Sequence, residues 1–109
     1  MDERHNQTET SGFGDKIILR WQPLVGQFAL DRARTDNTFL SYARDLRLLK
    51  TYLDEVGVEK WTEITPDLID NFLTSEISQG YSQASIGHHS IVIRGFVDWL
   101  IKADYPIPQ

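Results

Sequence analysis

Basic side chains gather in one short stretch of an otherwise acidic chain. They are Arg32, Arg34, Arg44, Arg47 and Lys50. Residues 32–53 therefore carry a net charge of +3, although the whole chain has 11 Lys and Arg against 16 Asp and Glu. Such a cluster can neutralise phosphates and release their counterions, which is the main source of affinity for nucleic acid. The competing interpretation is a solvated helix face whose cations pair with neighbouring acids.

Acidic side chains dominate the segment that follows, residues 54–76, with a net charge of −6. The acids are Asp54, Glu55, Glu59, Glu63, Asp67, Asp70 and Glu76. They lack the Asp-x-Asp-x-Asp-Gly pattern of a calcium loop. We therefore interpret them as a solvated face that points away from any nucleic acid.

Other residues that could do chemistry have simpler interpretations. Adjacent His88 and His89 point about 100° apart on a helix, so we expect one packed and one exposed histidine and no metal site. The Trp and Phe residues recur at helical spacing, which favours core positions over base-stacking platforms. The chain has no His-x-x-Arg, glycine-rich phosphate loop or nucleophile motif. We therefore expect no catalysis by this chain and no cofactor.

Length and composition predict one folded domain. The 109 residues are 40% hydrophobic and 11% aromatic, which is enough for a single packed core. The absence of Cys suits a reducing compartment. No apolar run approaches the roughly 18 residues of a membrane span, and the first residues are polar. We expect a cytoplasmic protein with no membrane partner, no secretory signal and no small-molecule substrate.

The hydrophobic pattern predicts a disordered arm over residues 1–14, followed by helices. Pro23 fits the first turn of a helix, which predicts a first helix over residues 22–34. Its candidate core residues are Leu24, Phe28 and Leu30. The second helix is the clearest, with Thr35 as its N-cap and Gly57 at its end. Its apolar stripe is Phe39, Tyr42, Leu46, Leu49, Leu53 and Val56, and the basic residues lie on the flank away from that stripe.

Two more helices complete the expected fold. Thr65 caps the third, Pro66 occupies its first position and Gly80 ends it. Its expected core residues are Leu68, Ile69, Phe72, Leu73 and Ile77. Ser82 caps the fourth helix, which continues to about residue 103, before Pro106 and Pro108. Four helices with short connections and no strand pattern predict a compact all-α domain.

Three segments in this order and spacing resemble the N-terminal core-binding domain of tyrosine recombinases, the SAM-like domain of the phage-integrase family. Residues 35–57 carry a capping residue three before Thr and a Tyr-x-x-Asp-Leu continuation. Residues 65–73 carry Thr followed by an apolar residue one turn later, and residues 80–100 carry a Ser cap, a further Ser and the run IRGF. The matching residues are Thr35, Thr38, Tyr42, Asp45, Leu46, Thr65, Leu68 or Ile69, Ser82, Ser85 and residues 93–96. The resemblance covers roughly residues 20–105.

The resemblance implies a compact four-helix SAM-like orthogonal bundle that clamps double-stranded DNA with its second and fourth helices. The DNA-facing positions of the family fall here on Thr38, Ser41, Arg44, Arg47, Gln83, Ser85 and His88, and we add Arg34 just ahead of the second helix. Relatives often carry Lys or Arg where this chain has Ala84 and Gly87, so few groove contacts are expected there. Leu40 and Leu48 lie near the polar flank, where they fit either a thymine methyl or a neighbouring helix.

The function implied is that of the DNA-binding N-terminal domain of a site-specific recombinase or integrase, whose strand cleavage belongs to a C-terminal domain absent from this chain. Residues 15–105 would form the DNA-binding domain and residues 106–109 would begin the linker. Other recombinase protomers are expected as partners. The alternative is a solitary helical adaptor that binds proteins and not DNA, because similar bundles serve both purposes.

Overall fold

The computed structural model describes residues 14–108, so the arm expected over residues 1–14 lies outside the described residues except for Gly14. Within the described part the helices are α2 (Ile17–Arg32), α3 (Asp36–Glu55), α4 (Pro66–Ser78) and α5 (Gln83–Lys102), with a short 3-10 helix η2 at Trp61–Glu63. Residues 14–108 contain no strand, only an isolated bridge between Lys16 and Lys60. The expected all-α class is therefore confirmed.

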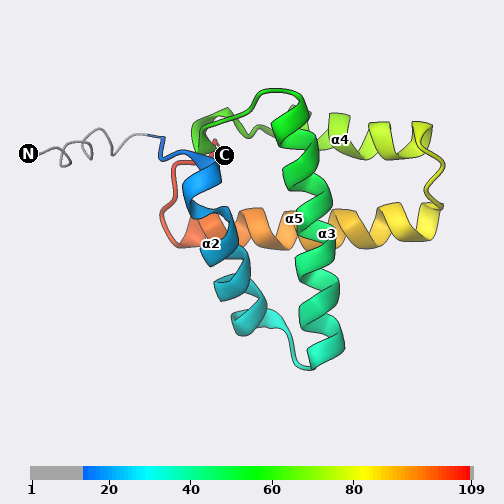
Figure 1. The fold of residues 1–109 in the computed structure, drawn as a ribbon, viewed down its shortest axis with the longest axis horizontal. Helices are drawn as coiled ribbons and strands as arrows, with labels where there is room; N and C mark the ends of the chain where they lie inside the picture. Colours follow the sequence, from blue (N-terminus) through cyan, green and yellow to red (C-terminus); the bar gives the residue numbers. More distant parts are fainter. Residues whose placement is uncertain (1–13, 109) are drawn as a thin grey trace, which may run out of the picture.

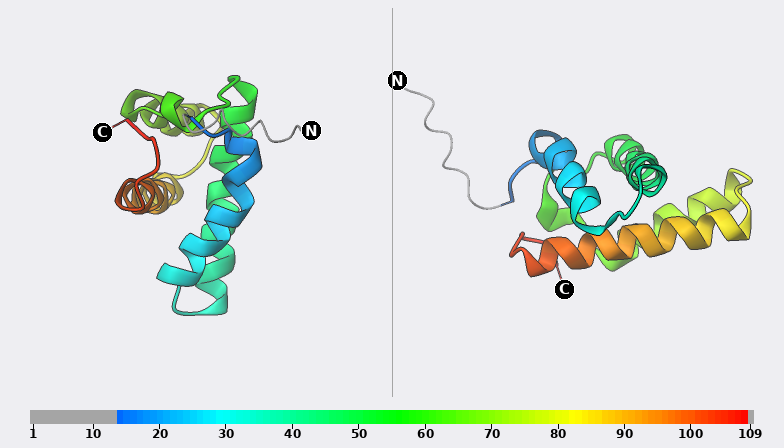
Figure 2. Two further views of the ribbon diagram at one scale, coloured as in Figure 1. Left: turned by 90° about the vertical axis from the view of Figure 1, so that its left-hand side faces the viewer. Right: turned by 90° about the horizontal axis from the view of Figure 1, so that it is seen from below.

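The helices form two pairs that cross each other (Figure 1). α2 and α3 lie side by side with opposite directions, and α4 and α5 form a second antiparallel pair. Figure 2 shows α5 running across the α2 and α3 pair. α3 packs against both α2 and α5, while α4 packs against α5. This arrangement is the orthogonal four-helix bundle that the sequence predicted.

Side-chain caps fix where α3, α4 and α5 begin. Thr35 Oγ1 accepts a hydrogen bond from the Thr38 N–H at 3.1 Å, and Thr65 Oγ1 accepts one from the Leu68 N–H at 3.1 Å. Ser82 Oγ accepts from the Ser85 N–H at 3.1 Å. Each cap satisfies an amide that has no partner inside its helix. The three predicted N-caps are confirmed.

An aromatic core lies where the two helix pairs cross. Trp21 stacks on Trp61 with ring centroids 5.7 Å apart, and Phe96 meets Trp21 edge to face at 5.4 Å. Phe28 and Trp99 extend the cluster toward α3 and the end of α5. Such pairs add specific geometry to the burial of large apolar surfaces. The core interpretation is confirmed for Trp21, Trp61, Phe72 and Phe96, which are buried, and for Trp99, which packs against the core.

The start of α2 differs from the prediction. The helix begins at Ile17 rather than near residue 22, so Pro23 lies inside it. Pro23 removes the amide that would bond to the carbonyl of Leu19, on a side of α2 where Leu19 is 71% exposed. Ile17 and Trp21 are buried, and the Ile17 N–H donates to the Glu59 carbonyl at 2.8 Å. Tertiary packing therefore holds a first turn that local propensity disfavours.

Three residues predicted for the core are exposed. They are Leu30 (70%), Ile77 (65%) and Val56 (48%). Leu30 and Ile77 lie in the last turns of α2 and α4, beside the buried Ala29 and Glu76, and Val56 lies just beyond the end of α3. For Leu40 and Leu48 the sequence left two interpretations, a DNA contact or packing against a helix. Leu48 packs against the core, whereas Leu40 is 64% exposed.

Candidate nucleic-acid interface

The middle of α3 presents two arginines to solvent. Arg44 has a side chain that is 71% exposed, and Arg47 is also exposed. Leu46 and Leu49 on the same helix are buried in the core. At about 100° per residue, the buried stripe fixes which flank of α3 is available to a partner. Both arginines therefore present their charges outward from a helix that packing holds in place.

Lys50 behaves differently from these two arginines. Its side chain is only 16% exposed, and Nζ lies 2.6 Å from Asp54 Oδ1 one turn later. A lysine held in this way has less freedom to reach a phosphate than the exposed arginines. The solvated-face interpretation thus fits Lys50 better than Arg44 or Arg47.

The remaining sites predicted near the start of α3 are spread along the helix. Arg34 is exposed in the connection before α3, Thr38 is partly buried in the first turn, and Ser41 is partly buried one turn later. The side chain of Thr35 donates to Thr38 Oγ1 at 2.9 Å, so the hydroxyl of Thr38 belongs to the cap. Figure 1 shows that the connection between α2 and α3 projects away from α5. The structure therefore does not bring this connection, which includes Arg34, together with α5.

The start of α5 offers the second group of predicted residues. Gln83 is exposed at the first helical position. Ser85 is partly buried, and its Oγ accepts a hydrogen bond from Ser82 Oγ at 3.1 Å. No acidic residue lies in the first turn. The unpaired amides and the helix dipole therefore favour an anion at this end of α5.

Asp45 connects the two groups of predicted residues. Its Oδ2 lies 2.7 Å from Nδ1 of His88 on α5, and its Oδ1 lies 3.6 Å from Nε of Arg44 on α3. Asp45 is fully buried, whereas the side chain of His88 is 50% exposed. The structure therefore brings Arg44 and His88 together around one carboxylate, at the point where α3 meets α5.

A buried polar cluster continues inward from Asp45. His89 Nε2 lies 3.6 Å from Asp45 Oδ1, and His89 Nδ1 hydrogen-bonds both carboxylate oxygens of Glu76 on α4 at 2.8 and 2.9 Å. Glu76 is 1% exposed and His89 is 6% exposed. The prediction of one packed and one exposed histidine is confirmed. The prediction that all the acids of residues 54–76 are solvated is wrong for Glu76.

The buried cluster was not predicted, although the sequence carries a signal for it. Glu76 follows Ile69 and Phe72 at spacings of three and four, and His89 precedes Ile93, Phe96 and Leu100 in the same way. Both polar residues therefore occupy positions of an apolar stripe. A charged residue in such a position is either exposed by fraying or paired inside the core.

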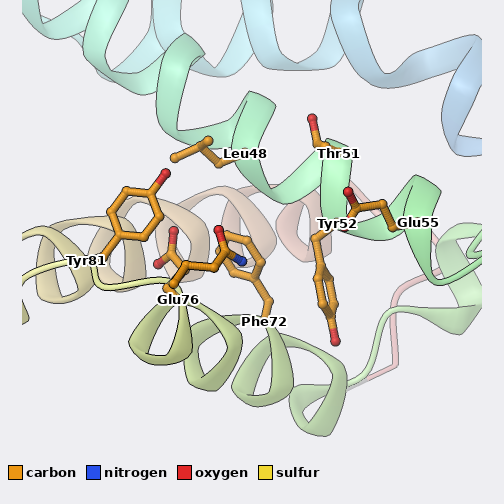
Figure 3. A pocket seen from close by; sticks show the side chains of 8 residues that line it. Leu48, Thr51, Tyr52, Glu55, Phe72, Glu76 and Tyr81 are labelled. Carbon is orange, nitrogen blue, oxygen red and sulfur yellow. The ribbon is translucent and has the colours of Figure 1, made fainter.

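A small cavity lies between α3 and α4, beside the buried cluster (Figure 3). Its volume is about 240 Å³. Leu48, Tyr52, Phe72 and Tyr81 provide its apolar walls, and Glu76 reaches it from α4. This volume is below the usual range for small-molecule sites, about 300–1,000 Å³. Across residues 14–108, no three His, Cys, Asp or Glu side chains gather in a way that could hold a metal ion.

Comparison with known families shows the family of this chain. The family described as phage integrase, N-terminal SAM-like domain, matches residues 26–104. The chain belongs to this family. The match covers most of the chain and includes α3, α4 and α5, together with part of α2. The predicted resemblance is therefore confirmed.

Individual relatives of this SAM-like domain are tyrosine recombinases. The chain is 26% identical over 74 residues to the tyrosine recombinase XerC of Escherichia coli O9:H4 (strain HS) and, to the same extent, to that of Escherichia fergusonii. The matched segment is 68% of this chain and 25% of each relative. The chain thus corresponds to about a quarter of each of these recombinases. No solved structure matches the chain.

None of the helices within residues 14–108 is long and apolar enough to cross a membrane.

Proposed function

We propose that this SAM-like domain binds double-stranded DNA for a site-specific tyrosine recombinase or integrase, using α3 and the first turns of α5, with strand cleavage carried out by a separate C-terminal domain. The contact of Arg44 and His88 with one buried carboxylate carries the proposal, because it unites residues of two helices in one exposed region. Membership of the recombinase domain family supports the same partner.

The proposed residues would make two kinds of contact with DNA. Arg44 and Arg47 supply exposed cations for phosphates, which set affinity and orientation but read no sequence. Gln83 and His88 lie at the start of a helix, where side chains can reach base edges in the major groove. Other recombinase protomers on the same DNA are the expected protein partners. A few phosphate contacts on a chain of net charge −5 predict weak binding by the isolated domain.

NMR spectroscopy of the ¹⁵N-labelled 109-residue chain, titrated with a random-sequence duplex at low salt, tests the proposal. Amide shifts should change over residues 34–47 and 82–88, and should change little over the exposed acids of α4. The variant R20A/K102A, which removes two cations from other parts of the fold, should give the same pattern. Absence of any duplex-dependent change would favour the protein-binding adaptor instead.

A further inference from the structure

The buried carboxylate of Asp45 is unusual for its position on α3. Its neighbour Leu46 and the following Leu49 and Leu53 are buried core residues, and Asp45 is as buried as they are. A charged group at such a place loses its hydration and destabilises the fold unless partners replace the water. An apolar residue would satisfy the packing at lower cost.

Asp45 is only partly compensated within the described residues. Neither carboxylate oxygen has a hydrogen bond of good geometry, even though His88 Nδ1 lies 2.7 Å from Oδ2. The contact of His88 with Asp45 is therefore a close polar contact rather than a well-directed hydrogen bond. His89 and Arg44 add contacts at 3.6 Å each. Asp45 is therefore held by surrounding cationic or polar groups rather than by a saturated hydrogen-bond network.

Hydrogen bonds hold the buried side of the cluster together. His89 is buried and hydrogen-bonds Glu76 through Nδ1, which fixes its ring and turns Nε2 toward Asp45. Polar side chains of α3, α4 and α5 thus form one connected row of contacts, which is buried at Glu76 and reaches the surface at Arg44 and His88. The exposed end of this row coincides with the proposed DNA contacts.

We infer that Asp45 is a positioning residue, which acts through Arg44 and His88 and holds these two side chains in the orientation that DNA binding requires. This inference rests on the proposed function. Asp45 itself touches no DNA, because it is fully buried. Its carboxylate orients the guanidinium group of Arg44 and the imidazole ring of His88. The cluster of His89 and Glu76 keeps the carboxylate in place.

A simple charge count predicts the opposite sign for the role of Asp45. Removing a negative charge from beside a phosphate-binding surface should strengthen DNA binding, because repulsion is lost. A positioning role predicts weaker binding, because Arg44 and His88 lose their orientation. The isosteric change Asp45→Asn therefore separates the two interpretations by the direction of its effect.

The test is a double-mutant cycle on duplex binding at low salt, using the 109-residue chain with Asp45→Asn, Arg44→Ala and both changes together. Asp45→Asn should weaken binding about two- to tenfold in the wild-type background and by a smaller factor once Arg44 is Ala, because coupled residues are not additive and only His88 is then left for the carboxylate to orient. Circular dichroism and the melting temperature of each variant show that binding is measured on folded protein.

Several outcomes would overturn the inference. Tighter or unchanged binding by Asp45→Asn identifies the carboxylate as a repulsive or silent charge. An equal loss in both backgrounds identifies a general structural effect. If the wild-type chain binds no duplex at all, the proposed function fails and the inference fails with it, whereas wild-type binding with the wrong cycle removes the inference alone.

A second cycle keeps the inference testable if Asp45→Asn does not fold. Arg44→Ala and His88→Gln change exposed or half-exposed side chains. If one carboxylate orients both, each loss disturbs the other, and the double variant should lose less affinity than the product of the two single losses. Losses that multiply would show that Arg44 and His88 act independently and would contradict a shared positioning group.

Discussion

His88 Nδ1 on α5 lies 2.7 Å from Asp45 Oδ2 on α3, and this contact joins the two helices at the edge of the candidate DNA surface. Asp45 is buried while His88 remains half exposed, so the contact runs from the core to the solvent. It also sets Arg44 and His88 near each other although they lie far apart in the sequence. A bundle of crossing helices can therefore present one continuous binding surface from distant segments.

The first prediction concerns base recognition by Gln83. Gln83 is exposed at the first position of α5, where an amide side chain can form paired hydrogen bonds to an adenine edge. Replacing it by Ala should change the preference among duplex sequences, by about 1–3 kcal/mol for a fully formed contact. Selection from a randomised duplex library followed by titration of the selected sites measures this preference.

Gln79→Ala provides the matched control for Gln83, because Gln79 is also exposed but lies at the end of α4. The control should leave sequence preference unchanged. Equal preferences for wild type and Gln83→Ala would exclude a base contact by this side chain.

The second prediction compares two apolar residues of α2. Phe28 is 3% exposed and packs against Tyr42, Phe96 and Trp99. Phe28→Ala should lower the free energy of unfolding by about 3–5 kcal/mol, because it leaves a cavity among these rings. Leu30→Ala should stay within about 0.5 kcal/mol of wild type, because Leu30 is 70% exposed. Urea denaturation measures both, and similar losses for the two variants would contradict the orientation of α2.

The third prediction concerns the pH dependence of stability through Glu63. Backbone hydrogen bonds from the Glu59 and Lys60 amides hold the pKa of Glu63 below its ordinary value of 4.5. A lowered pKa in the folded state means that the ionised carboxylate stabilises the fold at pH values above about 4.5. This stabilisation is lost as the pH falls through the folded pKa.

Glu63→Gln keeps the shape of the side chain and removes its charge. The variant should melt at a lower temperature than wild type at neutral pH, and the difference should shrink as the pH is lowered through the folded pKa of Glu63. Melting curves followed by circular dichroism give this comparison. A difference that is the same at neutral and at acidic pH would mean that the charge of Glu63 contributes nothing to stability.

The sequence was informative wherever local chemistry decides the structure. The caps Thr35, Thr65 and Ser82 begin α3, α4 and α5 as expected, because each supplies an oxygen to an amide that the helix leaves unpaired. Gly57 and Gly80 follow the ends of α3 and α4 with φ of +79° and +91°, which residues with a Cβ rarely adopt. Signals that start and end a helix can therefore be interpreted without knowledge of the tertiary fold.

Features that depend on packing between helices were predicted less well. The start of α2 is held by burial of Ile17 and Trp21, which outweighs the preference of Pro23 for a first turn. Ile77 of α4 is exposed, whereas its neighbour Glu76 is buried and hydrogen-bonds His89 of α5. The buried cluster of Asp45, Glu76 and His89 requires three helices to meet, which no single periodicity reveals.

The candidate DNA surface was predicted as a set of positions, and its geometry came only with the fold. The exposed Arg44 and Arg47 follow from the helical period of α3, whereas the pairing of Lys50 with Asp54 removes one expected cation. The contact between His88 and Asp45 depends on the crossing of α3 and α5. Whether these residues bind DNA stays a prediction.

The salt dependence of DNA binding tests the central claim most directly. Duplex affinity of the wild-type chain, of R44A/R47A and of the charge-matched control R20A/K102A should be measured over a range of salt concentrations by fluorescence anisotropy. Each phosphate contact contributes about −0.9 to the log-log slope, so R44A/R47A should bind more weakly and reduce the slope by about two. Helicity should be unchanged, and the control should keep the slope of wild type. Equal binding and equal slopes for wild type and R44A/R47A, or no binding by wild type even at low salt, would contradict DNA binding through α3.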